Sequence, residues 1–356
     1  MKLTTLFAAV QAVLILFASC NNKHQSRVPD WPWEDPEVQT DTTKPVDPVN
    51  LETPETSTEW TDVSSEYEGL PTYIKIWKSP DKLQNRKAIA FIADVDLSKG
   101  GFSVWGLNDP ELKGTTDPLK TPTQVYSSEG SPAVVINGGY FYSDSGKNYP
   151  ASLAVSGGKL LSPNINYASK DWVKIYYPTR AVFLQHEDGT YEAAWSYYKN
   201  STDHWVYQQP AENSYANSPL QVPNATFPSN GVKLEAVNGI GGGPVLIKGG
   251  EIKNTYIEEM YDSGGINPTS PNNPRTAIGV TADNHLVLFS CEGREQTEGV
   301  VGFTTEELAN ILLDYGCVEA INLDGGGSSM MLVCGQELFK PSDGSQRKVG
   351  SCIYVK

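Results

Sequence analysis

The chain has 356 residues, of which 39% are hydrophobic and 19% charged, and this composition is typical of a folded protein rather than a disordered one. Its 32 Gly and 24 Pro exclude a coiled coil or a helical bundle, because helix-breaking residues at this frequency favour short strands joined by turns. The net charge of -15 argues against nucleic acid as the main partner, since binding a phosphate backbone needs a concentrated Lys and Arg surface.

The first 20 residues predict an export signal. Lys2 precedes an apolar run that ends in residues 14–17, and Ala18-Ser19-Cys20 follows. The run is too short for a membrane span, which needs about 20 apolar residues, and small residues before a cysteine are typical of a lipobox. The segment resembles bacterial lipoprotein signals, so we expect removal of residues 1–19, a lipidated Cys20 and a cell-envelope location, periplasmic or at the cell surface. The alternative is a signal peptide without lipidation and an incidental Cys20.

Residues 20–69 read as an acidic tether rich in Pro and Thr. They hold 12 Asp and Glu against three Lys and Arg, which leaves a net charge of only -7 for residues 70–356. Self-repulsion and proline extend such a segment and hold a folded domain away from the membrane. Trp31, Trp33 and Trp60 either dock on the domain or lie in a disordered segment, and we favour the second interpretation. The folded domain is expected over residues 70–356.

Short apolar runs bounded by Gly, Pro, Asn or Asp predict β-strands throughout this domain. They occupy residues 73–77, 88–95, 133–136, 181–184, 244–247, 277–280 and 285–289. One well-capped helix is expected at about 304–315, because Thr304 and Glu307 form a capping box and Gly316 suits the helix end. We therefore expect an α+β fold of strand-dominated mixed sheets with a few helices.

Four cysteines follow Cys20, namely Cys291, Cys317, Cys334 and Cys352. An even number in an exported chain allows two disulfides with three possible pairings. We prefer a single Cys334–Cys352 bridge, and Cys317, which opens an apolar strand, can equally be a buried thiol. The spacings are unlike those of a zinc site.

Polar residues and glycines that could take part in binding or catalysis follow several of the predicted strands. In residues 320–331 an apolar strand delivers Asp324 to its end, and Gly325, Gly326 and Gly327 then let the backbone approach a ligand closely. The exposed amides and the hydroxyls of Ser328 and Ser329 could receive an anion or sugar oxygens. Alternatively, Asp-Gly-Gly is a tight hairpin whose Asp caps its own turn.

Similar turns occur at Asn137-Gly138-Gly139 and at Gly241-Gly242-Gly243. Neither matches a nucleotide-binding loop, because no Gly-Lys-Ser/Thr follows and neither opens a helix. Arg275-Thr276 begins another strand, where the guanidinium could hold a phosphate bidentately or form a surface ion pair. Glu292-Gly293-Arg294 places a carboxylate and a guanidinium at the end of the next strand.

Together these motifs resemble, in their order and in their residues, those of the phosphodiester glycosidase family. The resemblance runs from about residue 133 to residue 356, and its most specific element is the capped helix followed by a strand and residues 323–329. Family members cleave the bond between a sugar anomeric carbon and a phosphodiester oxygen. The resemblance therefore implies an exported hydrolase that acts on a sugar-1-phosphodiester or a related carbohydrate.

The resemblance also implies roles for the strand-end residues. Asp324 and Glu292 would be the catalytic carboxylates, because glycosidic cleavage generally uses two. Arg275 and Arg294 would hold the phosphate, and Asn137 and Asn322 would bind sugar hydroxyls. The remaining substrate-binding residues would be Gly138, Gly242, Thr276, Gly325, Gly326, Gly327, Ser328 and Ser329. No cofactor is expected, and Ca²⁺ on oxygen ligands near Asp324 is a minority option.

Residues 171–227 are rich in aromatic side chains and Asn. We expect most of these rings to make core and edge-strand contacts, with one or two at the rim of the cleft. A non-enzymatic carbohydrate-binding surface lipoprotein is the rival hypothesis, because it would need the rings but not the convergent carboxylates. A second rival is an inhibitor or adhesin scaffold with purely structural turns. Membrane contact is expected only through the lipidated Cys20.

Overall fold

The computed structural model describes residues 59–262 and 266–356, and it is mostly β-structure, with 37% strand against 8% helix. Every strand pair among these residues is antiparallel. The expected strand-dominated fold with a few helices is confirmed, the mixed sheets are corrected to antiparallel ones, and the α+β label fits this mostly-β structure only loosely. Short turns join some neighbours, such as residues 276–281 and 285–291, but other pairs, such as residues 90–96 and 285–291, come from distant parts of the chain, so local sequence signals do not set strand direction. The signal peptide, Cys20 and residues 20–58 of the tether lie outside the described residues.

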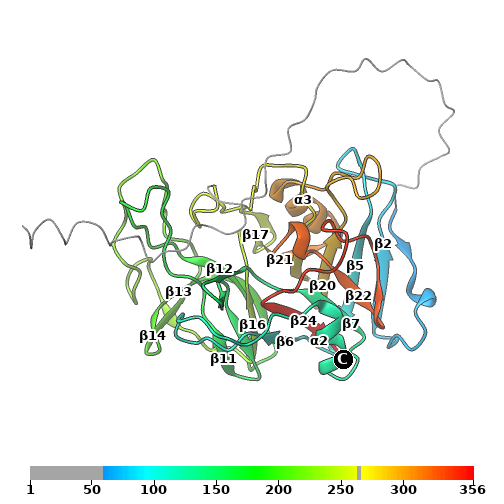
Figure 1. Ribbon diagram of the computed structural model, residues 1–356, viewed down its shortest axis with the longest axis horizontal. Coiled ribbons are helices and arrows are strands. Elements are labelled where there is room, and N and C mark those ends of the chain that lie inside the picture. The colour runs from blue at the N-terminus through cyan, green and yellow to red at the C-terminus, as the bar shows by residue number, and fades with distance from the viewer. Residues whose placement is uncertain (1–58, 263–265) are drawn as a thin grey trace, which may run out of the picture. The chain divides into compact units, whose positions relative to one another are not determined.

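An eight-stranded sheet supplies one layer of the fold (Figure 1). Its strands, in spatial order, are β1 (Thr61–Asp62), β2 (Ile74–Lys78), β5 (Ala90–Asp96), β20 (His285–Cys291), β19 (Thr276–Thr281), β21 (Cys317–Asn322), β17 (Val245–Lys248) and β18 (Glu251–Ile252). The strands predicted at 73–77, 88–95, 244–247, 277–280 and 285–289 are confirmed within this sheet, with ends shifted by a residue or two.

Two further sheets complete the β-structure. A five-stranded sheet has the order β23 (Gln336–Glu337), β22 (Met331–Val333), β7 (Val134–Asn137), β24 (Ser351–Val355) and β6 (Ser103–Gly106). A seven-stranded sheet has the order β11 (Lys159–Ser162), β10 (Ala154–Ser156), β16 (Asn238–Gly241), β12 (Arg180–Gln185), β13 (Tyr191–Asn200), β14 (Asp203–Tyr207) and β15 (Val232–Lys233). Two small hairpins pair β3 (Lys82–Leu83) with β4 (Arg86–Lys87) and β8 (Phe141–Asp144) with β9 (Lys147–Pro150).

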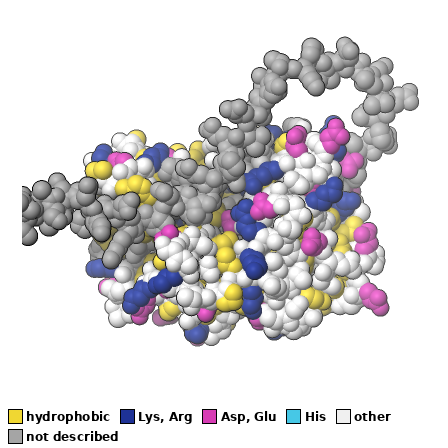
Figure 2. Space-filling model, in the orientation of Figure 1, with side chains coloured by type: hydrophobic (Ala, Val, Ile, Leu, Met, Phe, Trp, Pro, Cys, Tyr) yellow, Lys and Arg dark blue, Asp and Glu magenta, His cyan; other side chains and the backbone are white. Residues whose placement is uncertain are grey.

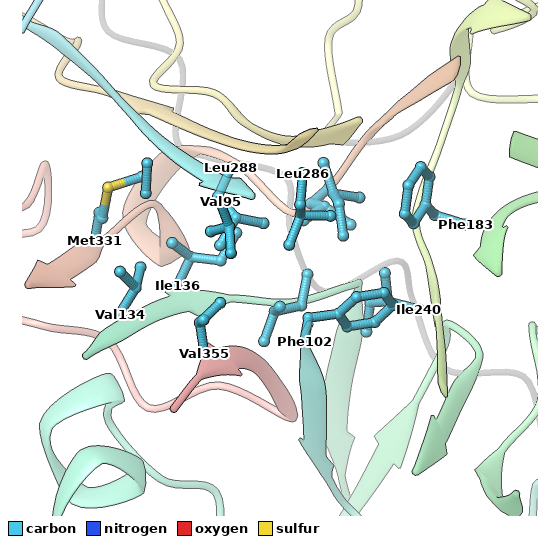
Figure 3. Packing of buried hydrophobic residues seen from close by; sticks show 14 of the residues in the cluster. Val95, Phe102, Val134, Ile136, Phe183, Ile240, Leu286, Leu288, Met331 and Val355 are labelled. Carbon is cyan, nitrogen blue, oxygen red and sulfur yellow. The ribbon is translucent and has the colours of Figure 1, made fainter. Parts of the chain in front are cut away.

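The central core lies where the three sheets face one another (Figure 3). Strand β20 shows how alternation builds it, because Leu286 and Leu288 face this core while Val287 and Phe289 face a second core on the other side. The central cluster draws Ile136 from the five-stranded sheet and Phe183 from the seven-stranded one. The middle strands are thus buried on both faces, which explains their continuous apolar sequences.

The two α-helices among the described residues each cover the outer face of a sheet. Helix α3 (Thr305–Tyr315) packs Leu308 and Leu312 into the second core of the eight-stranded sheet. Its predicted capping box between Thr304 and Glu307 is confirmed, and Gly316 ends it in a left-handed conformation. Helix α2 (Pro122–Ser128) covers the five-stranded sheet. Neither helix is long and apolar enough to span a membrane.

The folded part starts earlier than predicted. Residues 59–69, which the sequence assigned to the tether, include β1 and a short 3₁₀ turn, η1 (Ser64–Glu66). Val63 is buried, and the Trp60 ring lies edge-on to Tyr315 of α3 with ring centroids 6.1 Å apart. The favoured interpretation of Trp60 as part of a disordered segment was therefore wrong, because a short strand pairing brings its ring onto the helix. Trp31 and Trp33 lie outside the described residues.

The four described cysteines are free, so the preferred Cys334–Cys352 bridge was wrong. Strand β7 lies between β22 and β24, which places strands carrying or adjoining the two cysteines about 9–10 Å apart. They also lie toward opposite ends of β7, since Cys352 pairs with Asn137 whereas Cys334 follows Val333, the partner of Val134. A disulfide needs α-carbons within about 7 Å. Cys317 is a buried thiol, as one of the two interpretations held.

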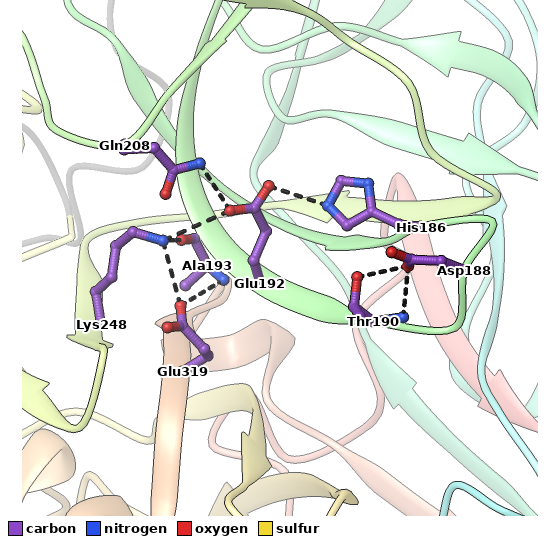
Figure 4. Close-up of polar contacts among 8 residues, drawn as sticks. All are labelled: His186, Asp188, Thr190, Glu192, Ala193, Gln208, Lys248 and Glu319. Carbon is purple, nitrogen blue, oxygen red and sulfur yellow. Dashed lines mark hydrogen bonds and ion pairs between the residues drawn. The ribbon is translucent and has the colours of Figure 1, made fainter. Parts of the chain in front are cut away.

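A charged cluster fastens the eight-stranded sheet to the seven-stranded one (Figure 4). Lys248 of β17 donates to the Ala193 carbonyl of β13 at 2.6 Å and lies 3.5–3.6 Å from the carboxylates of Glu192 and Glu319. Glu319 of β21 also accepts from the Ala193 amide at 2.9 Å. The cluster fixes the relative position of the strands whose ends carry the glycine-rich turns.

Candidate active site

The glycine-rich turns meet at one edge of the eight-stranded sheet. Each of five strands starts or ends at this edge, as their register shows. The paired residues there are Ala90 and Cys291, Thr276 and Ser290, Ala277 and Asn322, and Ile321 and Val245. The five-stranded sheet joins there, because Thr276 Oγ1 donates to Asn137 Oδ1 at 2.8 Å. Antiparallel pairing thus gathers turns that are up to nearly 190 residues apart in the chain, from Asn137 to Asp324.

Asp324 is held by backbone contacts on both sides. Its amide donates to the Gly138 carbonyl at 3.1 Å, and its own carbonyl accepts from Asn137 Nδ2 at 2.7 Å. One carboxylate oxygen accepts from the Gly325 amide at 2.9 Å. The loop then turns through η2 (Gly326–Ser328), where Gly326 has a φ of +57° that disfavours a side chain. These contacts fix the carboxylate at the sheet edge.

Burial is the main influence on this carboxyl and raises the pKa of Asp324 to about 6. The Ser328 hydroxyl, the Arg347 guanidinium, the Gly325 amide and the Arg294 guanidinium act in the opposite direction. Ser328 Oγ is close enough to lower the pKa, although its geometry makes no standard hydrogen bond among the described residues. Burial therefore disfavours the charged form of this carboxyl group, and the two guanidiniums partly offset that effect.

Arg294 and Glu292 reach this loop through the 273–275 turn. Built β-carbons on both Gly293 and Gly325 would contact Pro274, so the two turns pack against the same residue. Arg294 then lies against Gly326, its Nη2 only 2.7 Å from where a β-carbon would be, and donates to Asn273 Oδ1 at 3.2 Å. The absence of a side chain at Gly326 is what admits the guanidinium.

Glu292 is 2% exposed beside this turn. Its Oε2 accepts from the Lys340 amide at 3.4 Å, while Oε1 has no partner among residues 59–262 and 266–356. An unpaired buried carboxylate oxygen is costly in a folded protein, so this atom needs an explanation. Glu292 thus lies at the same edge as Asp324, as the sequence predicted.

The sequence analysis missed the segment over residues 339–349, here called the 339–349 loop. Besides the Lys340 contact, it brings Asp343 and Arg347 against Gly327, where a β-carbon would collide with both side chains. Arg347 donates through Nε at 2.8 Å and lies through Nη2 2.7 Å from the same oxygen, Asp343 Oδ2. The only sequence signal was a basic pair, Arg347-Lys348, just before the last strand.

Arg275 does not lie where a substrate phosphate could reach it. Its guanidinium is 2% exposed and donates to four carbonyls, those of Ile266, Asn267, Ser270 and Phe303, at 2.8–3.2 Å. Burial lowers the pKa of Arg275 to about 10. The predicted phosphate-binding role is corrected to a structural one, because the side chain turns inward to fasten the 266–275 segment against the start of α3.

Asn137, Thr276 and Ser329 also serve the fold. Asn137 is fully buried, and its Oδ1 accepts from Thr276 Oγ1 at 2.8 Å and from the Met330 amide at 3.1 Å. Thr276 Oγ1 lies 3.2 Å from Ser329 Oγ. The predicted contacts of Asn137 with sugar hydroxyls are therefore corrected, because both polar atoms of its amide already bind the protein. Its role is to position Asp324.

Asn322 and two predicted glycines are likewise packed inside. Asn322 Nδ2 donates to Tyr140 Oη at 2.9 Å and to the Gly243 carbonyl at 2.8 Å, while its Oδ1 has no partner among the described residues. A β-carbon on Gly242 would collide with the Asn322 carbonyl, and one on Gly138 with Ser351. Both glycine amides also donate within the protein, that of Gly138 to the Ser351 carbonyl and that of Gly242 to the Ala181 carbonyl, so the two glycines serve close backbone packing.

The aromatic stretch and one buried glutamate also serve the fold. The aromatic stretch mostly fills the interior, as expected, with Trp195, Tyr197 and Tyr207 buried. Glu259, which the sequence analysis did not single out, is fully buried, and burial raises its pKa to about 7. It accepts from the amides of Ala181 and Val245 at 2.8 Å and so fastens two strands. No three His, Cys, Asp or Glu side chains in the described ranges converge as metal ligands.

Comparisons with known proteins agree on one family. A family model described as phosphodiester glycosidase matches residues 131–356. Human N-acetylglucosamine-1-phosphodiester alpha-N-acetylglucosaminidase is 34% identical over 113 residues, which cover 30% of this chain and 21% of that protein. An uncharacterized SPbeta prophage-derived protein of Bacillus subtilis is 39% identical over 82 residues, covering 23% of this chain and 12% of that protein. The chain thus matches only a minor part of the length of these relatives.

The fold agrees as well. The catalytic domain of zebrafish N-acetylglucosamine-1-phosphodiester alpha-N-acetylglucosaminidase, described as auto-inhibited by its pro-peptide, superposes with a TM-score of 0.53 at 22% identity. The superposition covers 83% of this chain and 87% of that one. Since the family model matches more than half of the sequence, the chain belongs to the phosphodiester glycosidase family.

Proposed function

We propose that this chain hydrolyses the bond between the anomeric carbon of a sugar and the oxygen of a phosphodiester. Family membership and the names of the human and zebrafish relatives support this reaction class. The sugar and the group beyond the phosphate are left open. What the chain itself contributes is a sheet edge where two acidic side chains and an arginine surround a glycine-rich loop.

Asp324 is the proposed catalytic carboxylate. With a pKa of about 6 it is mostly ionised at neutral pH and remains a stronger base than an ordinary aspartate. A carboxylate so placed can stabilise positive charge at the anomeric carbon or activate water, the two tasks that glycosidic cleavage requires. Glu292, with its unpaired buried oxygen, is the proposed second carboxyl group.

Arg294 is the proposed phosphate ligand. A planar guanidinium binds phosphate oxygens in a bidentate way, and here it lies beside the loop that carries Asp324. Neutralising the phosphate makes it a good leaving group, so positioning and electrostatic stabilisation outweigh proton donation to the leaving oxygen. The amides of Gly325, Gly326, Ser328 and Ser329 already donate to acceptors of the protein, so side chains rather than these amides supply the donors to anionic oxygens.

The observation that carries the proposal is the convergence of Asp324, Glu292 and Arg294 on one glycine-rich loop. It is tested by screening the purified full-length protein against sugar-1-phosphodiesters, with Asp324→Asn as the inactive variant. Asp314→Asn, an exposed aspartate on α3, is the matched control. We expect the control to retain activity and Asp324→Asn to lose at least about 100-fold. Tight sugar binding without turnover by the wild type would instead favour the carbohydrate-binding alternative.

We further propose that the chain is exported and lipid-anchored. The support is the apolar N-terminal run followed by Ala18-Ser19-Cys20 and an acidic, proline-rich stretch. Lipidation of Cys20 would tether the domain to the cell envelope, with the segment before residue 59 supplying reach rather than site residues.

A further inference from the structure

We propose that Arg347 is a second phosphate-binding residue of this site and that Asp343 takes the place of the phosphate while the site is empty. The proposal rests on the proposed function, because it concerns the anionic part of the same substrate. It replaces the pair first expected from sequence, Arg275 and Arg294, with Arg294 and Arg347.

The two arginines lie against successive glycines of one loop. Arg294 contacts the position where Gly326 would carry a β-carbon, and Arg347 does the same at Gly327. Both guanidiniums also act electrostatically on the Asp324 carboxyl, which neither could do from a distant surface. An anion bound beside this loop would therefore lie within the field of both cations.

Electrostatics gives the second arginine a function. A phosphodiester carries one negative charge, and the proposed site already holds two acidic side chains, Asp324 and Glu292. Arg294 alone cannot balance these groups, and like charges brought together in a partly buried site repel strongly. A second guanidinium lowers this repulsion once Asp343, which pairs with it in the empty site, has given way to the phosphate. Lys and Arg side chains also occur together near the middle of the face drawn in Figure 2, despite the net charge of -15, although the figure does not place them at this site.

Asp343 behaves as a replaceable partner. Its Oδ2 alone contacts both Nε and Nη2 of Arg347, and about a third of each side chain is exposed, 35% for Asp343 and 36% for Arg347. Ion pairs this exposed contribute little to stability, so a phosphate can displace the carboxylate at small penalty. Phosphate offers oxygens that match the guanidinium fork.

The 339–349 loop does not depend on this ion pair for its position. Gln296 Nε2 donates to the Ser342 carbonyl at 3.1 Å, and Gln346 Nε2 bonds Thr123 Oγ1 at 2.7 Å and Glu337 Oε1 at 2.6 Å. The Lys340 amide reaches Glu292 from the same loop. Removing either Asp343 or Arg347 therefore leaves the loop anchored, and the two variants can be compared in a folded protein.

The test compares Arg347→Ala with Asp343→Asn, and Lys348→Ala serves as a control for general loss of positive charge. If the ion pair is only structural, both substitutions break it and must act alike. If Arg347 binds phosphate, only the loss of Arg347 weakens phosphate binding. Arg347→Ala should raise KM for the phosphodiester and the inhibition constant of inorganic phosphate by about tenfold or more, whereas Asp343→Asn should leave both unchanged or lower them.

A neutral aryl glycoside of the same sugar separates phosphate binding from a general defect, and we expect Arg347→Ala to leave its KM unchanged. Thermal unfolding checks that the variants fold, and Arg347→Lys, which keeps the charge but loses the fork, supplies a milder change with an intermediate KM. Equal effects of Arg347→Ala and Asp343→Asn, or an unchanged KM for the phosphodiester in Arg347→Ala, would overturn the proposal.

Direct binding of inorganic phosphate, measured by titration calorimetry, separates this proposal from the proposed function. Wild-type binding that Arg347→Ala abolishes supports the phosphate site even if no phosphodiester is cleaved, in which case only the proposed function fails. Cleavage by the wild type with unaltered phosphate affinity in Arg347→Ala refutes the role of Arg347 alone. Neither cleavage nor phosphate binding by the wild type contradicts both.

Discussion

Replacing Asp324 with Asn should stabilise the fold at neutral pH while it removes activity. The folded-state pKa of about 6 lies above the ordinary value of 3.8, so the folded chain holds a proton that the unfolded chain has already lost between these values. Rising pH through this interval therefore lowers the free energy of unfolding, and above about pH 6 the loss is complete. Asn stays neutral and avoids this loss.

The size of the effect follows from the two pKa values. A difference of about two pKa units corresponds to about 3 kcal/mol at pH 7.5 and to about 1 kcal/mol at pH 4.5, where the unfolded carboxyl is already largely ionised. These figures are upper bounds because Asp324 is partly exposed. We expect Asp324→Asn to gain about 1.5 kcal/mol at pH 7.5 and about a third of that at pH 4.5.

Urea unfolding of wild type and Asp324→Asn at both pH values measures the difference directly. A higher midpoint at pH 7.5 with an unchanged slope identifies a gain in stability. An Asp324→Asn protein that is less stable than wild type at pH 7.5, or equally displaced at both pH values, would refute the argument that burial holds this carboxylate in an unfavourable charged state.

Other consequences are equally accessible. Arg275→Lys should lower the free energy of unfolding by about 2–5 kcal/mol with KM unchanged, because one ammonium cannot bind four buried carbonyls. Arg294→Lys should instead raise KM and leave the free energy of unfolding unchanged. A wild-type urea midpoint for Arg275→Lys would contradict its structural assignment. Trp60→Ala should lower the free energy of unfolding by about 1–2 kcal/mol in the same assay, because it removes the contact with Tyr315. An unchanged free energy of unfolding would indicate that residue 60 belongs to the tether. Turnover should fall as the pH drops below about 6, where Asp324 becomes protonated, and a flat profile from pH 8 to 5 would exclude it as the ionised group. Cys20→Ser should release an active protein from membranes on fractionation, whereas a bound variant would argue against lipidation.

The sequence predicted the strands and the capped helix well because those signals are local. Alternation within β20 and the Thr304–Glu307 capping box depend only on neighbours in the chain, and both are confirmed. Strand direction was not local. It followed from how turns and long excursions connect the sheets, so the mixed sheets had to be corrected to antiparallel ones.

The candidate site was only partly predictable for a related reason. Asp324, Glu292 and Arg294 were found because they end apolar strands, and the structure gathers them at one edge. An arginine at the mouth of a strand, however, looks the same in sequence whether it points outward or inward, and Arg275 points inward to four carbonyls. Arg347 comes from a loop without any motif, and only its contact with Gly327 reveals it.

Hydrolysis of a sugar-1-phosphodiester in ¹⁸O-labelled water tests the central claim most directly. Cleavage between the anomeric carbon and oxygen places the label on the released sugar and leaves an unlabelled phosphate monoester, and this is the result we predict from mass spectra of the two products. Label in the phosphate would show attack at phosphorus, and the protein would then be a phosphodiesterase rather than a glycosidase.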